Sequence, residues 1–285
     1  MRRGDWLKYA LSVVVLCAAL GAWENPAHAA AACEPTKLVQ KYPGLAGKTL
    51  TVAMPADSKP VAYRDPNNLD NLIGFAADYA RGVFLCLGAP YKIMVAPLSG
   101  GLAAASSGQA DMVWSTIYYT PERAKALDFV LYQKAASGGV VPKDNPKHIS
   151  SFEDLCGHSA VAQIGSLEAL KLDEATKACL GKGKTAIDIM TAPDRASGMR
   201  LLDSGRVDLY LGIGIKGAYP DNMTLSFIYT SDIRAGIGLT KGSTELERAV
   251  VDAVTVLQAN GFERKLYETY EIDPSLTFPP TIVTQ

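Results

Sequence analysis

Strand-like and helix-like patterns alternate along most of this chain of 285 residues. Residues 50–54 and 91–95 are short apolar runs with the length of buried strands. Residues 74–87, between them, repeat large apolar side chains every three or four positions, as one face of a helix requires. An Ala-rich segment follows, in which Ser99 can cap a helix that ends at Gly108. This order predicts an α/β fold, with a mainly parallel sheet flanked by helices.

The middle of the chain holds a second series of the same kind. We expect strands at residues 159–163, 185–190 and 207–213, and helices at residues 166–180 and 194–204. No internal repeat or low-complexity segment competes with this interpretation. The second series therefore predicts a second α/β unit.

Two segments have the composition expected of connections between the two units. Residues 132–143 and 231–241 both combine small or polar residues with strand patterns. After the second segment, Thr244 and Glu247 have the spacing of a capping box, and the helix that they begin returns the chain to the first unit. The domains predicted are a discontinuous lobe 1, residues 30–134 plus 236–285, and lobe 2, residues 135–235. Two crossings between lobes form a hinge and place a cleft at the interface.

Residues 108–129 predict a site for a small anion at this interface. Asp111 begins a buried strand pattern, a polar and aromatic segment follows, and Thr120 can then cap a helix whose first residue is Pro121. Arg123 is the third residue of that helix. A guanidinium beside the unpaired N–H groups of a helix start is suited to a carboxylate. The alternative is that Arg123 is an ordinary solvated residue of a first helical turn.

The N-terminal residues have the layout of a secretory signal peptide. Three basic residues precede an apolar run at residues 9–20, and small residues suitable for cleavage end at Ala29. The apolar run is too short for a membrane-spanning helix. We expect residues 1–29 to be removed by cleavage near Ala29, leaving a monomeric mature protein in the periplasm.

The charge balance argues against nucleic acid as a partner. Removal of residues 1–29 takes three basic and two acidic side chains from the 28 and 29 of the whole chain, so 25 and 27 remain. No basic run is left in the mature sequence. Nucleic acid and anionic membrane surfaces both require clustered Lys and Arg, so neither is expected to bind.

Four cysteines remain in the mature chain, an even number in an oxidising compartment. Three pairings are possible, and we favour Cys33 with Cys86 and Cys156 with Cys179, because each pair falls within one predicted lobe. Four buried free thiols are the alternative. Metal binding is not expected, because the cysteines lack Cys-x-x-Cys spacing and the histidines are scattered.

Six short motifs are spread over nearly the whole mature chain. They lie at residues 74–78, 108–111, 120–123, 165–166, 205–208 and 238–242. In this order and at this spacing they resemble the family 3 extracellular solute-binding proteins, the periplasmic amino-acid receptors of ABC importers. The resemblance implies the type II periplasmic-binding-protein fold, with two lobes and two hinge crossings.

The resemblance also implies a set of ligand-binding residues on both lobes. Arg123 would bind the carboxylate of the ligand, and Leu98 would pack on its aliphatic part. Three residues at a helix start, Gly165, Ser166 and Leu167, would offer N–H groups to the same carboxylate. The remaining members of the implied set are Ser115, Thr116, Tyr118, Asp57 and Ser58. Ser166 as a plain N-cap and Leu98 as a core residue are the alternatives. One of Tyr118 and Tyr119 should face the cleft, because neighbours on a strand point to opposite faces.

Two positions depart from the family pattern. Ile213 stands where an acidic residue usually pairs with the α-ammonium of the ligand, and Tyr118 stands where a small hydroxyl residue is common. The hypothesis that follows is a small carboxylate whose amine is absent, is substituted, or pairs instead with Asp57 or Glu168.

The function expected is that of a periplasmic substrate-binding protein that delivers a small carboxylate-bearing solute, an amino acid or a derivative, to an ABC permease. No cofactor, metal or catalytic residue is expected. Two alternatives remain on the same fold: a periplasmic dehydratase-like enzyme that acts on cyclic carboxylates, and an accessory protein of a periplasmic dehydrogenase. Catalysis needs an acid or base at the reacting atom, and Glu168 is the nearest acidic candidate.

Overall fold

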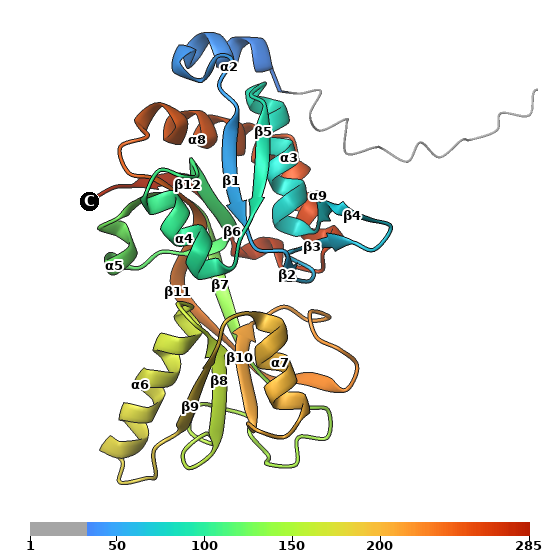
Figure 1. Cartoon of the computed structure of the whole chain (residues 1–285), viewed down its shortest axis with the longest axis vertical. Coiled ribbons are helices and arrows are strands. Elements are labelled where there is room, and N and C mark those ends of the chain that lie inside the picture. The colour runs from blue at the N-terminus through green and yellow to red at the C-terminus, as the bar shows by residue number, and fades with distance from the viewer. Residues whose placement is uncertain (1–32) are drawn as a thin grey trace, which may run out of the picture.

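The computed structural model describes residues 33–285, and within them the chain forms two lobes joined by two long strands (Figure 1). One nine-stranded mixed sheet runs through both lobes of this part of the chain, in the order β5-β1-β6-β11-β7-β10-β8-β9, with β12 paired to β7. The predicted signal peptide, residues 1–29, lies outside the described residues. The two-lobed α/β architecture expected from the sequence is confirmed.

The first lobe, in the upper part of Figure 1, contains the chain's first parallel strands. Its sheet strands are β1 (Leu50–Met54), β5 (Tyr91–Val95), β6 (Met112–Tyr118) and β12 (Thr277–Val283). Its helices are α2 (Pro35–Lys41), α3 (Phe75–Leu87), α4 (Leu98–Ser106), α5 (Pro121–Ala124), α8 (Thr244–Ala259) and α9 (Phe262–Thr269). A small separate sheet contains β2 (Asp57–Ser58), β3 (Ala62–Asp65) and β4 (Asn68–Ile73). Two short 3-10 helices are η1 (Pro43–Leu45) and η2 (Pro274–Leu276).

The side chains of β1 point alternately to the two faces of the sheet, and the core of this lobe has one layer on each face. Val52 and Met54 pack with the buried residues of α3, α8 and α9, while Ala53 packs on the opposite face with Ala104 of α4 and Ala124 of α5. Successive residues of a strand point to opposite faces, so one apolar strand can serve both layers. The apolar face of α8, with Leu246, Val250, Ala253 and Leu257, is also buried in the first of these layers.

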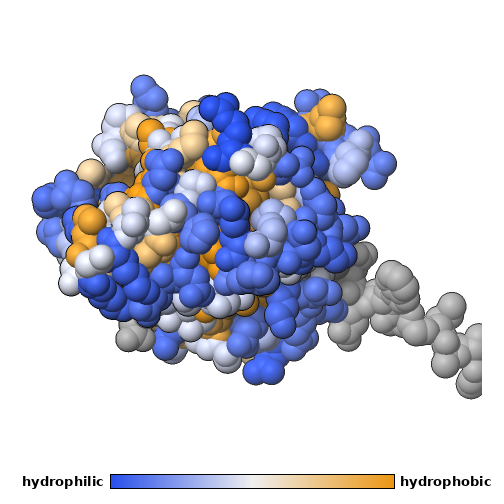
Figure 2. All heavy atoms as spheres, turned by 90° about the horizontal axis from the view of Figure 1, so that it is seen from below, coloured by the Kyte–Doolittle hydropathy of each residue, from blue (hydrophilic) through white to orange (hydrophobic). Residues whose placement is uncertain are grey.

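The second lobe repeats this arrangement on a smaller scale. Its elements are β8 (Ser159–Gln163), α6 (Leu167–Gly181), β9 (Asp188–Ala192), α7 (Arg195–Asp203) and β10 (Leu209–Ile213). Residues of β8 alternate between a cluster with α6 and a cluster with α7. Figure 2 views the molecule from the end of this lobe, where hydrophilic residues cover most of the surface and hydrophobic side chains gather near its middle.

The lobes are connected by β7 (Leu127–Pro142) and β11 (Met223–Thr240). These two strands pair antiparallel with each other from Leu127 opposite Thr240 to Pro142 opposite Met223, with several register shifts. The predicted crossings at residues 132–143 and 231–241 overlap these strands, and each runs one residue beyond the end of its strand. The exact lobe limits at 134/135 and 235/236 stay a prediction, because both strands run through these positions without a break.

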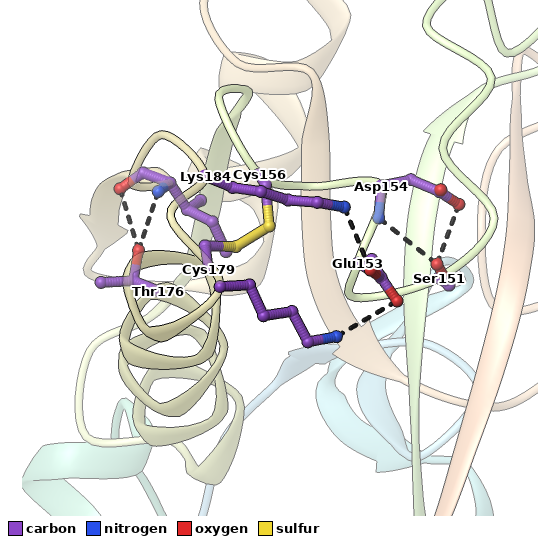
Figure 3. Close-up of a disulfide and its surroundings, with 9 residues drawn as sticks. Ser151, Glu153, Asp154, Cys156, Thr176, Cys179 and Lys184 are labelled. Atoms are coloured by element: carbon purple, nitrogen blue, oxygen red, sulfur yellow. Dashed lines mark hydrogen bonds and ion pairs between the residues drawn. A yellow bond between two sulfur atoms is a disulfide. The ribbon is translucent and has the colours of Figure 1, made fainter.

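Both disulfides of the structure confirm the pairing favoured from the sequence. Cys33 binds Cys86 and Cys156 binds Cys179, with Cα atoms 4.9 and 5.6 Å apart. Figure 3 shows the second bond tying α6 to the loop before β8. Beside it, the Lys184 ammonium group donates to Glu153 Oε1 at 3.0 Å, so the disulfide fixes α6 to this loop and the ion pair fixes the segment that follows α6.

Two predicted helix caps are wrong. Helix α4 begins at Leu98 after Pro97, so Ser99 lies inside its first turn and caps nothing. Helix α8 begins at Thr244 with Ser243 in the N-cap position, and no side chain caps it. Glu247 cannot complete a capping box because its carboxyl group is buried and faces Asp128.

Candidate functional site

A bulge in β6 forms the lip of the cleft on the first lobe. Trp114 pairs with Ile237 and Ile117 pairs with Gly236, which leaves two residues of β6 unopposed between them. These residues are Ser115 and Thr116, and Thr116 has φ 53°, a rare conformation for a β-branched residue. Bulges of this kind redirect side chains beside functional sites.

A cavity of about 70 Å³ lies between the lobes beside this lip. The first lobe supplies side chains from β2, α4, β6 and α5, and the second lobe supplies them from β8, α6, α7 and β10. The polar and charged lining residues are Asp57, Ser115, Thr116, Tyr118, Arg123, Gln163, Ser166, Glu168, Arg195 and Tyr210. The apolar ones include Leu98, Val61 and Ile213.

Arg123 is positioned by the helix start that the sequence predicted. The Thr120 hydroxyl accepts a hydrogen bond from the Arg123 backbone N–H at 3.1 Å, with Pro121 as first helical residue. The guanidinium is half-buried, and it donates to the backbone carbonyl of Tyr118 at 2.7 Å and to that of Gly165 at 2.6 Å. Burial lowers the pKa of Arg123, and the nearby Glu168 acts in the opposite direction. A cation from the first lobe thus faces the gap and contacts the second lobe.

Glu168 is buried in the same cavity. It is 4% exposed, and its Oε1 accepts hydrogen bonds from the Tyr118 hydroxyl at 3.1 Å and the Ser137 hydroxyl at 2.8 Å. It therefore points into the cleft from the first turn of α6. Burial raises the pKa of Tyr118 well above its ordinary value, and Glu168 raises it further.

The start of α6 differs in part from the expected carboxylate site. Ser166 lines the cavity and caps the helix, accepting from the Ala169 N–H at 3.2 Å. Its own N–H donates to the Gln163 carbonyl at 3.1 Å, so the N–H expected for the ligand already has a partner. Gly165, at φ 74°, turns its carbonyl to Arg123, while Leu167 is buried in a small cluster with Tyr118.

Two of the remaining expected residues, Leu98 and Asp57, line the cavity. Ser58 pairs with Ala62 through its backbone, and its side chain lies outside the described part of the structure. Tyr118 lines the cavity, and Tyr119 instead packs edge-on against Phe129, with ring centroids 5.5 Å apart. The prediction that one of these two tyrosines faces the cleft is confirmed.

Arg195 is the main cavity residue that sequence reasoning missed. It is 4% exposed at the start of α7, donates to the Lys59 carbonyl at 2.9 Å, and stacks on the Tyr219 ring at 4.5 Å. Its backbone N–H donates to Asp57 Oδ2 at 3.2 Å. These contacts join α7 of the second lobe to the β2–β3 region of the first. The only sign of this residue in the sequence was its place directly after Asp194, the N-cap of α7.

A larger hollow of about 460 Å³ adjoins the cavity on the hinge side. The two spaces share four lining residues, Val61, Thr116, Tyr118 and Ile213. Among residues 33–285, no group of His, Cys, Asp and Glu side chains could hold a metal ion. In the same described part, no helix is long and apolar enough to cross a membrane.

This fold and cleft define a two-lobed solute-binding protein, and comparison with known proteins specifies which kind. The family model of the bacterial extracellular solute-binding proteins, family 3, matches residues 50–272. The chain belongs to this family, as the motifs indicated.

Curated relatives are similar over different shares of their length. The L-cystine-binding protein TcyJ of Escherichia coli (strain K12) is 24% identical over 228 residues, covering 78% of this chain and 82% of TcyJ. The arginine-binding extracellular protein ArtP of Bacillus subtilis (strain 168) is 31% identical over 124 residues. That match spans less than half of either protein, 44% of this chain and 47% of ArtP.

Solved structures share the architecture. An ancestral arginine-binding protein bound to arginine has a TM-score of 0.68 and 25% identity, covering 78% of this chain and 97% of that protein. A histidine kinase sensor domain similar to periplasmic binding proteins has the same TM-score at 19% identity, covering 80% and 98%. The second likeness concerns the fold alone.

Proposed function

We propose that this chain is the periplasmic substrate-binding protein of an ABC importer, and that its two lobes close around a small carboxylate-bearing solute, an amino acid or a derivative. The observation that supports this most is the position of Arg123. Its guanidinium comes from the first lobe, lines the interlobe cavity and reaches the Gly165 carbonyl of the second lobe. A carboxylate bound there would contact a cation that already spans the gap.

The binding energy of such a ligand would favour the closed arrangement. A ligand that contacts both lobes binds the closed form more tightly than the open form, and it shifts the population by that difference. The long strands β7 and β11 are the connections about which such closure would occur. The curated relatives named for arginine and cystine support an amino-acid-type ligand.

The export and transport partners are part of the proposal. Two disulfides in the structure agree with an oxidising compartment outside the cytoplasm. An ABC permease and a monomeric mature protein complete the proposed assembly. Intact mass of the protein isolated from cells would test cleavage near Ala29.

Calorimetry against amino acids, opines, keto acids and polyamines tests the binding function. Tight binding without turnover would support the receptor. Product formation detected in the same mixtures would favour the dehydratase-like alternative, and absence of binding across the panel would favour the accessory role.

A further inference from the structure

The interlobe cavity is small for a ligand site, and it adjoins a larger space. Its volume is about 70 Å³, whereas pockets that bind small molecules usually measure about 300–1,000 Å³. The hollow on the hinge side measures about 460 Å³, which is within that range. The two spaces meet at the four residues that line both, Val61, Thr116, Tyr118 and Ile213. A ligand larger than the cavity can therefore extend into the hollow.

Contacts between the lobes close two other sides of the cavity. On the side of β2, the Arg195 backbone N–H donates to Asp57 Oδ2 at 3.2 Å, and the Arg195 guanidinium donates to the Lys59 carbonyl at 2.9 Å. On the side of α5, Arg123 donates to the Gly165 carbonyl at 2.6 Å. A ligand whose carboxylate is held by Arg123 therefore has room to extend on the hinge side, toward the hollow.

The inner wall of the hollow is apolar. Phe75 at the start of α3, Ala135 of β7 and Ile272 are buried and line it. Ile215 and Leu276 line it as well, and both pack against the core of the first lobe. An apolar ligand group placed against this wall would leave water, which favours binding.

The charged residues that line the hollow are at its rim and are balanced in sign. They are Lys134, Lys216, Glu271 and Asp273, and all four are exposed. Two are basic and two are acidic, so the rim as a whole attracts neither a cation nor an anion. The part of a ligand that lies in the hollow is therefore best uncharged.

We propose that the receptor binds a carboxylate with an extended, uncharged and mainly apolar tail, such as an N-acyl amino acid. The carboxylate lies at Arg123, and the tail passes Tyr118 and Ile213 into the hollow. This inference rests on the proposed receptor function and narrows its ligand class. It also gives Ile213 a role, because an isoleucine where the two spaces meet offers apolar contact, whereas a charged residue there would lose water to the tail.

The test varies the tail while the carboxylate stays the same. Calorimetry would measure binding of N-acetyl-, N-butanoyl-, N-hexanoyl- and N-octanoylglycine, and in parallel of alanine, 2-aminohexanoic acid and 2-aminooctanoic acid. In at least one series the affinity should rise about two- to fourfold for each added methylene, because each methylene that enters the hollow is removed from water. A short amino acid held in the cavity alone would gain nothing from added methylenes.

A ligand without the carboxylate tests the other end of the site. N-octanoylglycinamide has the same tail as N-octanoylglycine and no negative charge. It should bind about 10-fold more weakly, or worse, because it lacks the charge-assisted hydrogen bonds to Arg123. Arg123→Ala should weaken every acid of the series by a similar factor.

Two substitutions in the hollow should reduce the dependence on tail length. Ile228 is 44% exposed and lines the hollow, so Ile228→Trp should fill part of this space at little cost to the fold. Ile215→Ser removes apolar surface from the wall. Each variant should lower the gain per methylene and leave the affinity for the shortest acid of the series unchanged. Ile282→Trp is the matched control, since Ile282 is 38% exposed on β12 and pairs with Val130, outside the hollow.

Distinct results would overturn the inference and the function beneath it. The inference is wrong if short acids bind and longer tails bind no better in either series, or if both hollow variants keep the gain per methylene of the wild type. It is also wrong if Arg123→Ala weakens N-acetylglycine but not N-octanoylglycine, because the tail would then bind without the carboxylate site. If the wild type binds no acid of either series and no compound of the earlier panel, the proposed function fails and the inference fails with it.

Discussion

Arg123 of the first lobe and Gly165 of the second lobe are joined by a hydrogen bond of 2.6 Å from Nη2 to the backbone carbonyl oxygen. Gly165 has φ 74°, a conformation that L side chains rarely adopt, and this turn presents its carbonyl to the cleft. The same guanidinium also donates to the Tyr118 carbonyl at the lip. One side chain therefore links the strand end of one lobe to the helix start of the other.

Replacing Arg123 by Ala should weaken binding of a carboxylate ligand by about 2 to 5 kcal/mol, because it leaves a buried carboxylate without its cation. The measurement is calorimetry with the ligand that the panel identifies. Lys125→Ala is the matched control, since Lys125 is exposed two residues later and pairs with Glu122. Equal affinity of the Arg123 variant and the wild type would remove this residue from the binding site.

Thr116→Gly should leave the unliganded protein as stable as the wild type or more stable. A β-branched residue at φ 53° stores strain of about 1–3 kcal/mol that glycine does not, while glycine in a strand costs about 0.5–1 kcal/mol. Ser115 is the neighbouring bulge residue and does not have a positive φ. Ser115→Gly should therefore lower the free energy of unfolding by the cost of glycine in a strand, with no relief of strain. Urea unfolding of the three proteins would measure the difference, and equal destabilisation by both substitutions would show that Thr116 is unstrained.

The sequence predicted those parts of the fold that depend on local patterns. The strands at residues 50–54, 91–95 and 159–163 occur with the predicted limits, and the cap at Thr120 follows from residue types within one turn. The disulfide pairing was also favoured correctly, because co-location in a lobe could be inferred from element order. The position of Arg123 in the gap follows from the same local reasoning combined with the family resemblance.

The rest depends on contacts that join distant parts of the chain. The β6 bulge is set by pairing with Gly236 and Ile237 of β11, so the sequence around Thr116 gives no sign of it. Glu168 points into the cleft because the Ser137 hydroxyl of β7 and the Tyr118 hydroxyl lie opposite it. Glu247 has the spacing of a capping residue, yet tertiary packing turns it toward Asp128.

The pair of buried acids at the start of α8 should make stability depend on pH. Asp128 and Glu247 are each 2% exposed, and Asp128 Oδ2 accepts the Gly242 N–H at 2.6 Å. Burial, then the neighbouring Asp128, raises the pKa of Glu247 from 4.5 to about 7, while Arg248 acts in the opposite direction. Between these two pKa values the folded chain keeps a proton that the unfolded chain loses. The free energy of unfolding should therefore fall, by up to about 3 kcal/mol, as pH rises from about 4.5 to about 7.

Glu247→Gln should remove this dependence, because the amide keeps the shape of the protonated acid and does not titrate. Urea unfolding of the wild type and the variant across this pH range would measure the two slopes, with the exposed Glu268→Gln as control. The variant should be the more stable protein near pH 7, where the wild type begins to charge the buried Glu247 carboxyl group. Parallel slopes for the wild type and the Glu247 variant would mean that this acid titrates alike in the folded and unfolded chains.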